Sequence, residues 1–144
     1  MIRAEHDVHV SASPEEAFDR LADMRNEIDW NPMTTEMAKA SEGEVGSGTR
    51  FEGKMKRVGS MYMVISDYDR PRRLGMRGGS RGADVHFTAN FEPADGGTRI
   101  HTELGLEPKG IVKLFTPLMA RQVPKQEVES MEAFKRWIDR GVSG

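Results

Sequence analysis

The chain has 144 residues, 37% of them hydrophobic and 31% charged, and its formal net charge is −2. These values predict one soluble globular domain over residues 1–144 and imply neither a nucleic-acid nor a membrane partner. Cysteine is absent, which excludes disulfides, thiolate nucleophiles and cysteine-ligated metals. No stretch reaches the roughly 20 apolar residues that membrane insertion needs, and the charged N-terminus does not resemble a signal peptide, so we expect a cytoplasmic location.

The first predicted elements are a strand and a capped helix. Alternation in "AEHDVHVS", residues 4–11, predicts a half-buried strand. In "SASPEEAFDRLADM" a serine N-cap and a proline at the first helical position predict a helix. A second short helical turn leads to Trp30, which lies in "EIDWNPM" two residues before a proline. No apolar run surrounds Trp30, so the local sequence does not explain a role in the core. The question is which part of the structure its ring packs against.

Residues 33–107 show alternating segments between turn residues, which predict about six antiparallel strands. The best-defined pair is "ADVHFTANFEP" and "TRIHTELGLEP", joined by the turn "ADGG". Matching their apolar faces pairs Phe91 with Ile100 and Phe87 with Leu104, because a slip of one residue would place the apolar set in water.

Helical spacing of apolar residues returns over residues 111–119 and, after Pro124, over residues 128–138. Pro117 and Pro124 are expected to kink or interrupt this region, and Gly141 to end it. A helix over residues 125–140 would be about 24 Å long, enough to cross a sheet. Its charged residues, which we expect to form a solvent-exposed exterior, are Lys125, Glu127, Glu129, Glu132, Lys135, Arg136 and Asp139.

The order of these elements predicts an α+β fold. A curved antiparallel sheet of about seven strands would wrap around a long C-terminal helix, with two short helices after the first strand. A strongly bent sheet and one covering helix leave space between them, and such a space suits a ligand.

Four motifs together resemble the START-like superfamily, whose helix-grip fold is that of the birch pollen allergen. They are "VSASPEEAFDRLADM" with "DWNP", "DRPRRL", "FEPADGGTRI" and the long C-terminal helix. The closest similarity is to the polyketide cyclase/dehydrase group of small bacterial proteins. The resemblance implies a sheet wrapped around the helix, with hydrophobic molecules such as lipids, sterols, plant hormones or polyketide intermediates between them. Some members of the superfamily are enzymes, and many bind such a molecule without catalysing a reaction. It also implies that Trp30 packs where the short helices meet the pocket, with direct ligand contact as the alternative.

Histidine and glycine patterns favour no metal and no cofactor. The four histidines lack ligand spacing, and the hairpin register places His86 and His101 on the outer face. The glycines of "GEVGSG" and "GGSRG" do not link a strand to a helix, as a phosphate-binding turn must. A basic cluster is either a solvated edge or a rim for a carboxylate or phosphate at the cavity mouth; it consists of Arg70, Arg72, Arg73, Arg77 and Arg81.

Three functions are compatible with this sequence. The first is non-catalytic binding of a hydrophobic, lipid-like or polyketide-like small molecule. The second is a cyclase, aromatase or dehydratase, which would need a buried polar pair inside an otherwise apolar cavity. The third is a protein-interaction module that uses the solvent face of the last helix or the exposed strand. We expect a monomer or a homodimer. Participants considered for the polar pair, none of them assigned as catalytic, are Asp29, Tyr62, Asp67, Arg77 and Thr102.

The predicted ligand-binding residues are Trp30 and apolar residues on the predicted inward faces. An amphipathic stripe is more often packing than a binding site, so about half of them are expected to be plain core. The strand over residues 60–68 is apolar on both faces, so its register stays open. The set is Trp30, Phe51, Met55, Met63, Leu74, Met76, Phe87, Phe91, Leu104, Phe115 and Met119.

Overall fold

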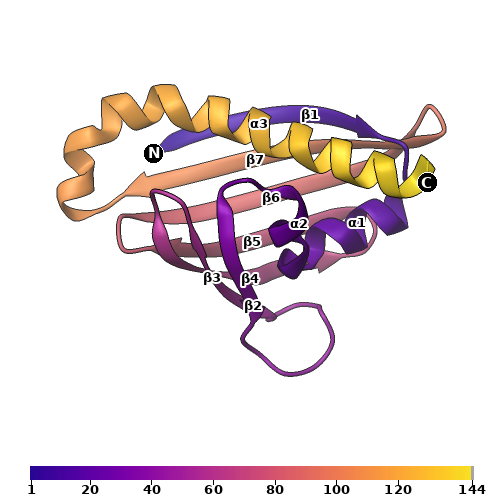
Figure 1. Cartoon of the computed structure of the whole chain (residues 1–144), viewed down its shortest axis with the longest axis horizontal. Helices are drawn as coiled ribbons and strands as arrows, with labels where there is room; N and C mark the ends of the chain where they lie inside the picture. The colour runs from indigo at the N-terminus through magenta and orange to yellow at the C-terminus, as the bar shows by residue number, and fades with distance from the viewer. Residues whose placement is uncertain (144) are drawn as a thin grey trace.

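A seven-stranded antiparallel sheet and a 28-residue C-terminal helix make up most of the fold (Figure 1). The computed structural model describes residues 1–143. In chain order the elements are β1 (Ile2–Val10), α1 (Pro14–Ala22), the 3-10 helix η1 (Met24–Asn26), α2 (Glu27–Trp30), β2 (Thr34–Lys39), β3 (Arg50–Met55), β4 (Gly59–Asp69), β5 (Arg73–Ser80), β6 (Ala83–Ala94), β7 (Gly97–Pro108), the 3-10 helix η2 (Gly110–Phe115) and α3 (Thr116–Ser143). The predicted helix-grip fold is confirmed.

The strand order in the sheet is β1-β7-β6-β5-β4-β3-β2, so β1 and β2 form its two edges. β6 and β7 pair in the predicted register, with Phe91 opposite Ile100 and Phe87 opposite Leu104. β2 has only six residues, and a bulge between Thr34 and Glu36 interrupts its pairing with β3. The hairpin prediction succeeded because alternation and a tight turn fix the same register independently.

The inner face of the sheet carries the core. The previously open register of β4 places Met63 and Ile65 in the interior and Tyr62 on the outer face. α1 closes one end of this core through Phe18, whose ring lies 5.2 Å from the Phe91 ring. Ser13 caps α1 by accepting a hydrogen bond from the third helical N–H, as its sequence position predicts.

α3 crosses the inner side of the sheet and packs mainly on β1 (Figure 1). It continues through both Pro124 and Gly141, so Pro124 does not interrupt the helix and the predicted end at Gly141 is wrong. Proline removes one internal hydrogen bond, and a helix this long keeps its other bonds and its packing. Pro117 lies in the first turn, where a missing N–H leaves no bond unmade. Within residues 1–143 no helix has the length and apolar character needed to cross a bilayer.

One flank of α3 contacts β1 through polar side chains. Asp139 accepts a hydrogen bond of 2.8 Å from the backbone N–H of Ser11, and Lys135 donates to the backbone carbonyl of His9. The helix is therefore less exposed than the sequence suggested. The prediction that Glu127 belongs to the charged exterior is wrong, because its side chain is buried against the sheet.

Candidate functional site

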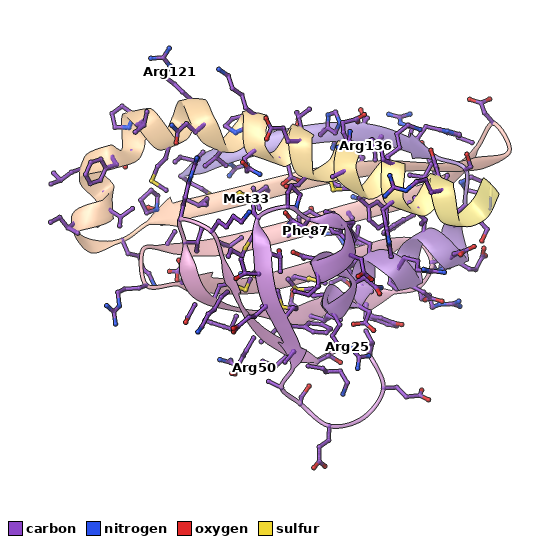
Figure 2. The ribbon with its side chains drawn as sticks, in the orientation of Figure 1. Arg25, Met33, Arg50, Phe87, Arg121 and Arg136 are labelled. Carbon is purple, nitrogen blue, oxygen red and sulfur yellow. The ribbon has the colours of Figure 1, made fainter. Side chains whose placement is uncertain are left out.

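The interior between the sheet and α3 is closed at one end and partly uncovered at the other. At the closed end Phe91 and Ile100 are buried. Toward the other end of the same strands Phe87, Val85 and Leu106 are only half-buried. This end lies next to η2 and the start of α3, and Figure 2 shows Phe87 in the region beneath α3. A partly uncovered apolar surface inside the fold is where an apolar ligand would lie.

Glu127 is a buried carboxyl on the sheet-facing side of α3. Burial raises its pKa to about 7, although the neighbouring Thr102 hydroxyl, which donates to the His6 backbone carbonyl at 3.3 Å, acts in the opposite direction. Thr102 is fully buried on the inner face of β7. Within the described part of the chain the Oε1 atom of Glu127 is buried and has no hydrogen-bond partner. A buried acceptor without a partner usually marks a site for water or a ligand.

A second carboxyl comes from α2, where the half-buried Glu27 turns its side chain toward Asn31 and Thr34. Its Oε1 atom accepts hydrogen bonds from the Thr34 hydroxyl at 2.9 Å and from the Asn31 side-chain amide at 3.1 Å. Burial outweighs both bonds and raises the pKa of Glu27 to about 7. Asn31 also accepts a bond from the Met33 backbone N–H, which fixes the chain after α2.

The two carboxyls influence one another. The negative charge of Glu27 contributes to the raised pKa of Glu127, since like charges in a poorly solvated region oppose each other. Near pH 7 each carboxyl is therefore partly protonated, and the charge of Glu27 disfavours ionisation of Glu127. Such a pair offers a hydrogen-bond donor and an acceptor, or an acid and a base, inside an otherwise apolar interior.

Trp30 ends the same short helix, α2, that carries Glu27, and its contacts answer the question that its sequence position raised. Its ring is buried and meets the Phe134 ring of α3 edge to face, with centroids 5.2 Å apart. The ring thus closes the contact between α2 and α3. Its indole Nε1 is a buried donor with no partner among residues 1–143, so packing alone does not account for it.

Sequence reasoning missed both carboxyls. Of the five participants considered for a polar pair, the structure brings only Thr102 to the site. Asp29 is exposed, Asp67 pairs with an arginine at 2.6 Å, and Tyr62 and Arg77 belong to the outer face. Glu127 did carry a signal, because it precedes Met131 by four residues and Phe134 by seven, on the buried stripe of α3.

The predicted ligand-binding residues fall into three groups. Those buried in the core are Trp30, Phe51, Met63, Leu74, Met76 and Phe91. Those half-buried are Met55, Phe87, Leu104 and Met119. Phe115 is exposed, and the prediction that it faces inward is wrong. Its segment is a 3-10 helix with about three residues per turn, so an α-helical stripe does not describe its faces.

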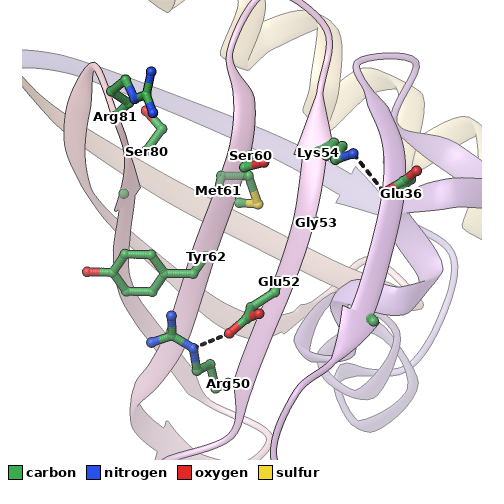
Figure 3. Close-up of a pocket in the computed structure, with 12 residues that line it drawn as sticks. Glu36, Arg50, Glu52, Gly53, Lys54, Ser60, Met61, Tyr62, Ser80 and Arg81 are labelled. Atoms are coloured by element: carbon green, nitrogen blue, oxygen red, sulfur yellow. Dashed lines mark hydrogen bonds and ion pairs between the residues drawn. The ribbon is translucent and has the colours of Figure 1, made fainter.

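The basic cluster and a nearby hollow belong to the outside of the sheet. Arg70 binds Asp19 with two hydrogen bonds, of 2.7 and 2.8 Å, which fits a solvated edge better than a vacant anion site. The hollow shown in Figure 3 lies on the outer faces of β3 and β4. There the Arg50 guanidinium lies 4.3 Å from the Tyr62 ring centroid and also pairs with Glu52. This hollow is not the predicted cavity between sheet and helix.

One exposed group has the composition of a metal site. Side-chain ligand atoms of Glu5, His101 and Glu103 lie within 4.8 Å of one another on the outer face. His101 is hydrogen-bonded at 2.8 Å to Asp7, which raises the pKa of His101 and so favours its protonated form. Asp7 and Glu103 lie 2.8 and 3.5 Å from the two imidazole nitrogens, so this arrangement fits surface ion pairing.

Comparison with solved structures defines the class of protein. A START superfamily protein from Mycobacterium smegmatis has a TM-score of 0.72 at 15% identity, covering 98% of this chain and 97% of that one. The di-domain ARO/CYC BexL from the BE-7585A biosynthetic pathway has a TM-score of 0.72 at 19% identity, covering 94% of this chain and 46% of that one. Ara h 8.0201 has a TM-score of 0.59 at 17% identity, and the match covers 92% of this chain and 97% of that one. The chain thus has the START-type helix-grip fold.

The family follows from the sequence itself. The profile described as "Polyketide cyclase / dehydrase and lipid transport" matches residues 1–138, and the chain belongs to this family. None of the curated proteins compared with the sequence matches it. Membership supports a role in hydrophobic-ligand binding or polyketide processing, as the sequence motifs implied.

Proposed function

We propose that the protein binds a hydrophobic small molecule, lipid-like or polyketide-like, between the inner face of the sheet and α3. The ligand carries a polar group that enters the region of Glu127 and Trp30. The observation that carries this proposal is that two buried polar atoms have no hydrogen-bond partner among the described residues: Glu127 Oε1 on the sheet-facing side of α3 and Trp30 Nε1 where α2 meets α3.

The chemistry of these atoms restricts the ligand. An ionised Glu127 needs a hydrogen-bond donor, and the indole N–H needs an acceptor. A hydroxyl group supplies both kinds of bond, whereas an ether oxygen supplies only an acceptor. Bonds to charged groups are the stronger ones, so we expect the Glu127 contact to dominate the preference for a hydroxyl.

Ligand binding is tested with an apolar fluorescent probe, N-phenyl-1-naphthylamine, displaced by a fatty alcohol or by a methyl ether of the same length. The alcohol is expected to displace the probe at about tenfold lower concentration, because it can donate to Glu127. Glu127→Leu should abolish the difference between alcohol and ether. Glu129→Leu, an exposed position on the same helix, should retain it.

Native mass spectrometry of the gently purified protein, compared with its denatured mass, would identify a retained ligand. Failure of the protein to take up the probe would contradict ligand binding itself. Uptake with equal displacement by alcohol and ether would contradict only the role of Glu127.

A second candidate function is a dehydratase or cyclase reaction in the same space. The observation that favours it is the pair of carboxyls with pKa values of about 7. In a dehydration the ionised carboxyl takes a proton from the carbon next to a carbonyl. The protonated carboxyl gives its proton to the departing hydroxyl, so water leaves, a carbon–carbon double bond forms and the pair has exchanged its proton.

This reaction is tested with the aldol of benzaldehyde and acetone, whose dehydration produces an absorbing enone. The rate should be highest near pH 7, where one carboxyl can be ionised while the other is protonated. Glu27→Gln and Glu127→Gln should each lower it by about a hundredfold or more, and Glu129→Gln should leave it unchanged. A rate equal to that of buffer alone would leave the binding function and exclude catalysis of this substrate.

A further inference from the structure

The segment that joins β7 to the first turns of α3 exposes a cluster of large apolar side chains. We define the junction segment as residues 109–126. Within it Ile111 is 75% exposed, Leu114 76%, Phe115 55% and Leu118 51%. Ile111 and Leu114 are three residues apart in the 3-10 helix η2 and so lie on one side of it, and Phe115 and Leu118 follow within the next turn.

The rest of the described surface has no comparable group. Apart from the N-terminal methionine, the other exposed large apolar residues are isolated from one another in the sequence and at most 47% exposed; they are Ile28, Val58, Tyr62 and Val128. Single exposed apolar residues need no explanation, but a contiguous group usually marks a binding surface.

The same segment is strongly basic. It contains four basic residues and no acidic one, in a chain whose net charge is −2. Lys109 pairs with Asp84 at 3.1 Å, whereas Lys113, Arg121 and Lys125 are exposed. Figure 2 shows Arg121 projecting away from the fold. Positive charge thus accompanies the exposed apolar residues rather than being spread evenly over the surface.

Helix geometry places part of this charge beside the apolar residues. Residues three or four apart on an α-helix share a face, so Leu118, Arg121 and Lys125 form one row along α3. The segment is also anchored from behind, because the Lys109 backbone N–H donates to the Gly82 carbonyl at 2.9 Å and Val112 packs on Gly82. Its apolar residues are therefore presented on a fixed support.

We propose that the junction segment docks on the surface of an anionic lipid bilayer. Apolar side chains that enter the headgroup region, with lysine and arginine next to them, are the two attractions that hold a protein at such a surface. No spanning helix is involved. The segment borders the partly uncovered end of the interior, so docking would bring that end next to the lipid. The proposal does not depend on any interior ligand, since docking uses exterior residues only.

The test is flotation of the full chain with vesicles of phosphatidylcholine alone or mixed with phosphatidylglycerol. The protein should float with the anionic vesicles, and added salt should weaken the association. Arg121→Glu should weaken it more than about fivefold, the effect of losing one positive charge. Arg136→Glu, an exposed position farther along α3 with the same change in net charge, should have little effect.

The apolar contribution is tested separately by Leu114→Ser and Phe115→Ser. Each should lower binding at least tenfold, because the lost methylene groups or ring no longer enter the headgroup region. Ile28→Ser is the matched control on α2. Circular dichroism checks that each variant is folded, as expected for exposed positions. Three results would overturn the proposal: no flotation with either vesicle, equal loss in the control variants, or a dimer in sedimentation that Leu114→Ser converts to a monomer.

Discussion

Between pH 5 and pH 8 the protein is expected to lose about 2–3 kcal/mol of its free energy of unfolding for each of Glu27 and Glu127 that ionises inside the fold. Both carboxyls have a pKa of about 7 in the folded protein, against 4.5 as the ordinary value. The folded state therefore holds more protons than the unfolded state between these two values. Since stability falls with rising pH wherever the folded state binds more protons, the loss occurs in this window.

Urea unfolding at a series of pH values measures this loss. Glu127→Gln keeps the shape of the side chain but cannot ionise, so it should flatten the pH dependence and make the variant more stable than the parent at pH 8. Glu129→Gln should change neither, because that carboxyl is exposed. The neighbour Asp7 raises the pKa of His101, which adds a loss of the same sign above about pH 6.5. If the stability of the parent protein rises from pH 5 to pH 8, the raised pKa values of Glu27 and Glu127 are contradicted.

Phe134→Ala is expected to cost about 3–5 kcal/mol of the free energy of unfolding. Phe134 is fully buried on α3, and its ring meets Trp30 at 5.2 Å and Trp137 at 6.0 Å. Truncation would leave a cavity between α2, α3 and the sheet, and would remove the edge-to-face contact with Trp30. Urea unfolding at pH 5, where both carboxyls are mainly protonated, measures the effect without the charge penalty.

Phe115→Ala is the matched control, because it makes the same change in the same part of the chain. Phe115 is exposed, so we expect a change within about 0.5 kcal/mol. Equal costs at both positions would mean that Phe115 is packed in solution. That result would also count against the junction segment as an exposed surface.

The fold was predictable because two independent local signals agree along most of the sheet. Alternation defines the inner face, and turn residues define where each strand ends. Where both signals were present, as in the hairpin that pairs Phe91 with Ile100, even the register was right. Where the alternation was lost, in the strand that contains Tyr62 and Met63, only the structure defines the faces.

The site was not predictable in the same way. Glu27 lies in a four-residue helix, too short for any periodicity, and its surroundings depend on how α2 packs on β2 and α3. Glu127 was grouped with charged neighbours such as Glu129, although the phase of the α3 stripe places it inside. The opposite error occurred at Phe115, where α-helical spacing in a 3-10 segment suggested burial. At Glu127 the charge of the residue outweighed its position, whereas at Phe115 the wrong helical period was assumed.

The short outer strand β2 bears on how the protein behaves at high concentration. An open sheet edge exposes unpaired backbone groups to which a strand of another molecule can add. β2 has six residues, a bulge between Thr34 and Glu36, and charged side chains at Glu36 and Lys39. Each of these features opposes the growth of intermolecular sheets. The opposite edge strand, β1, is flanked by α3 through Lys135 and Asp139. Neither edge of the sheet is therefore a good template for a strand of another molecule.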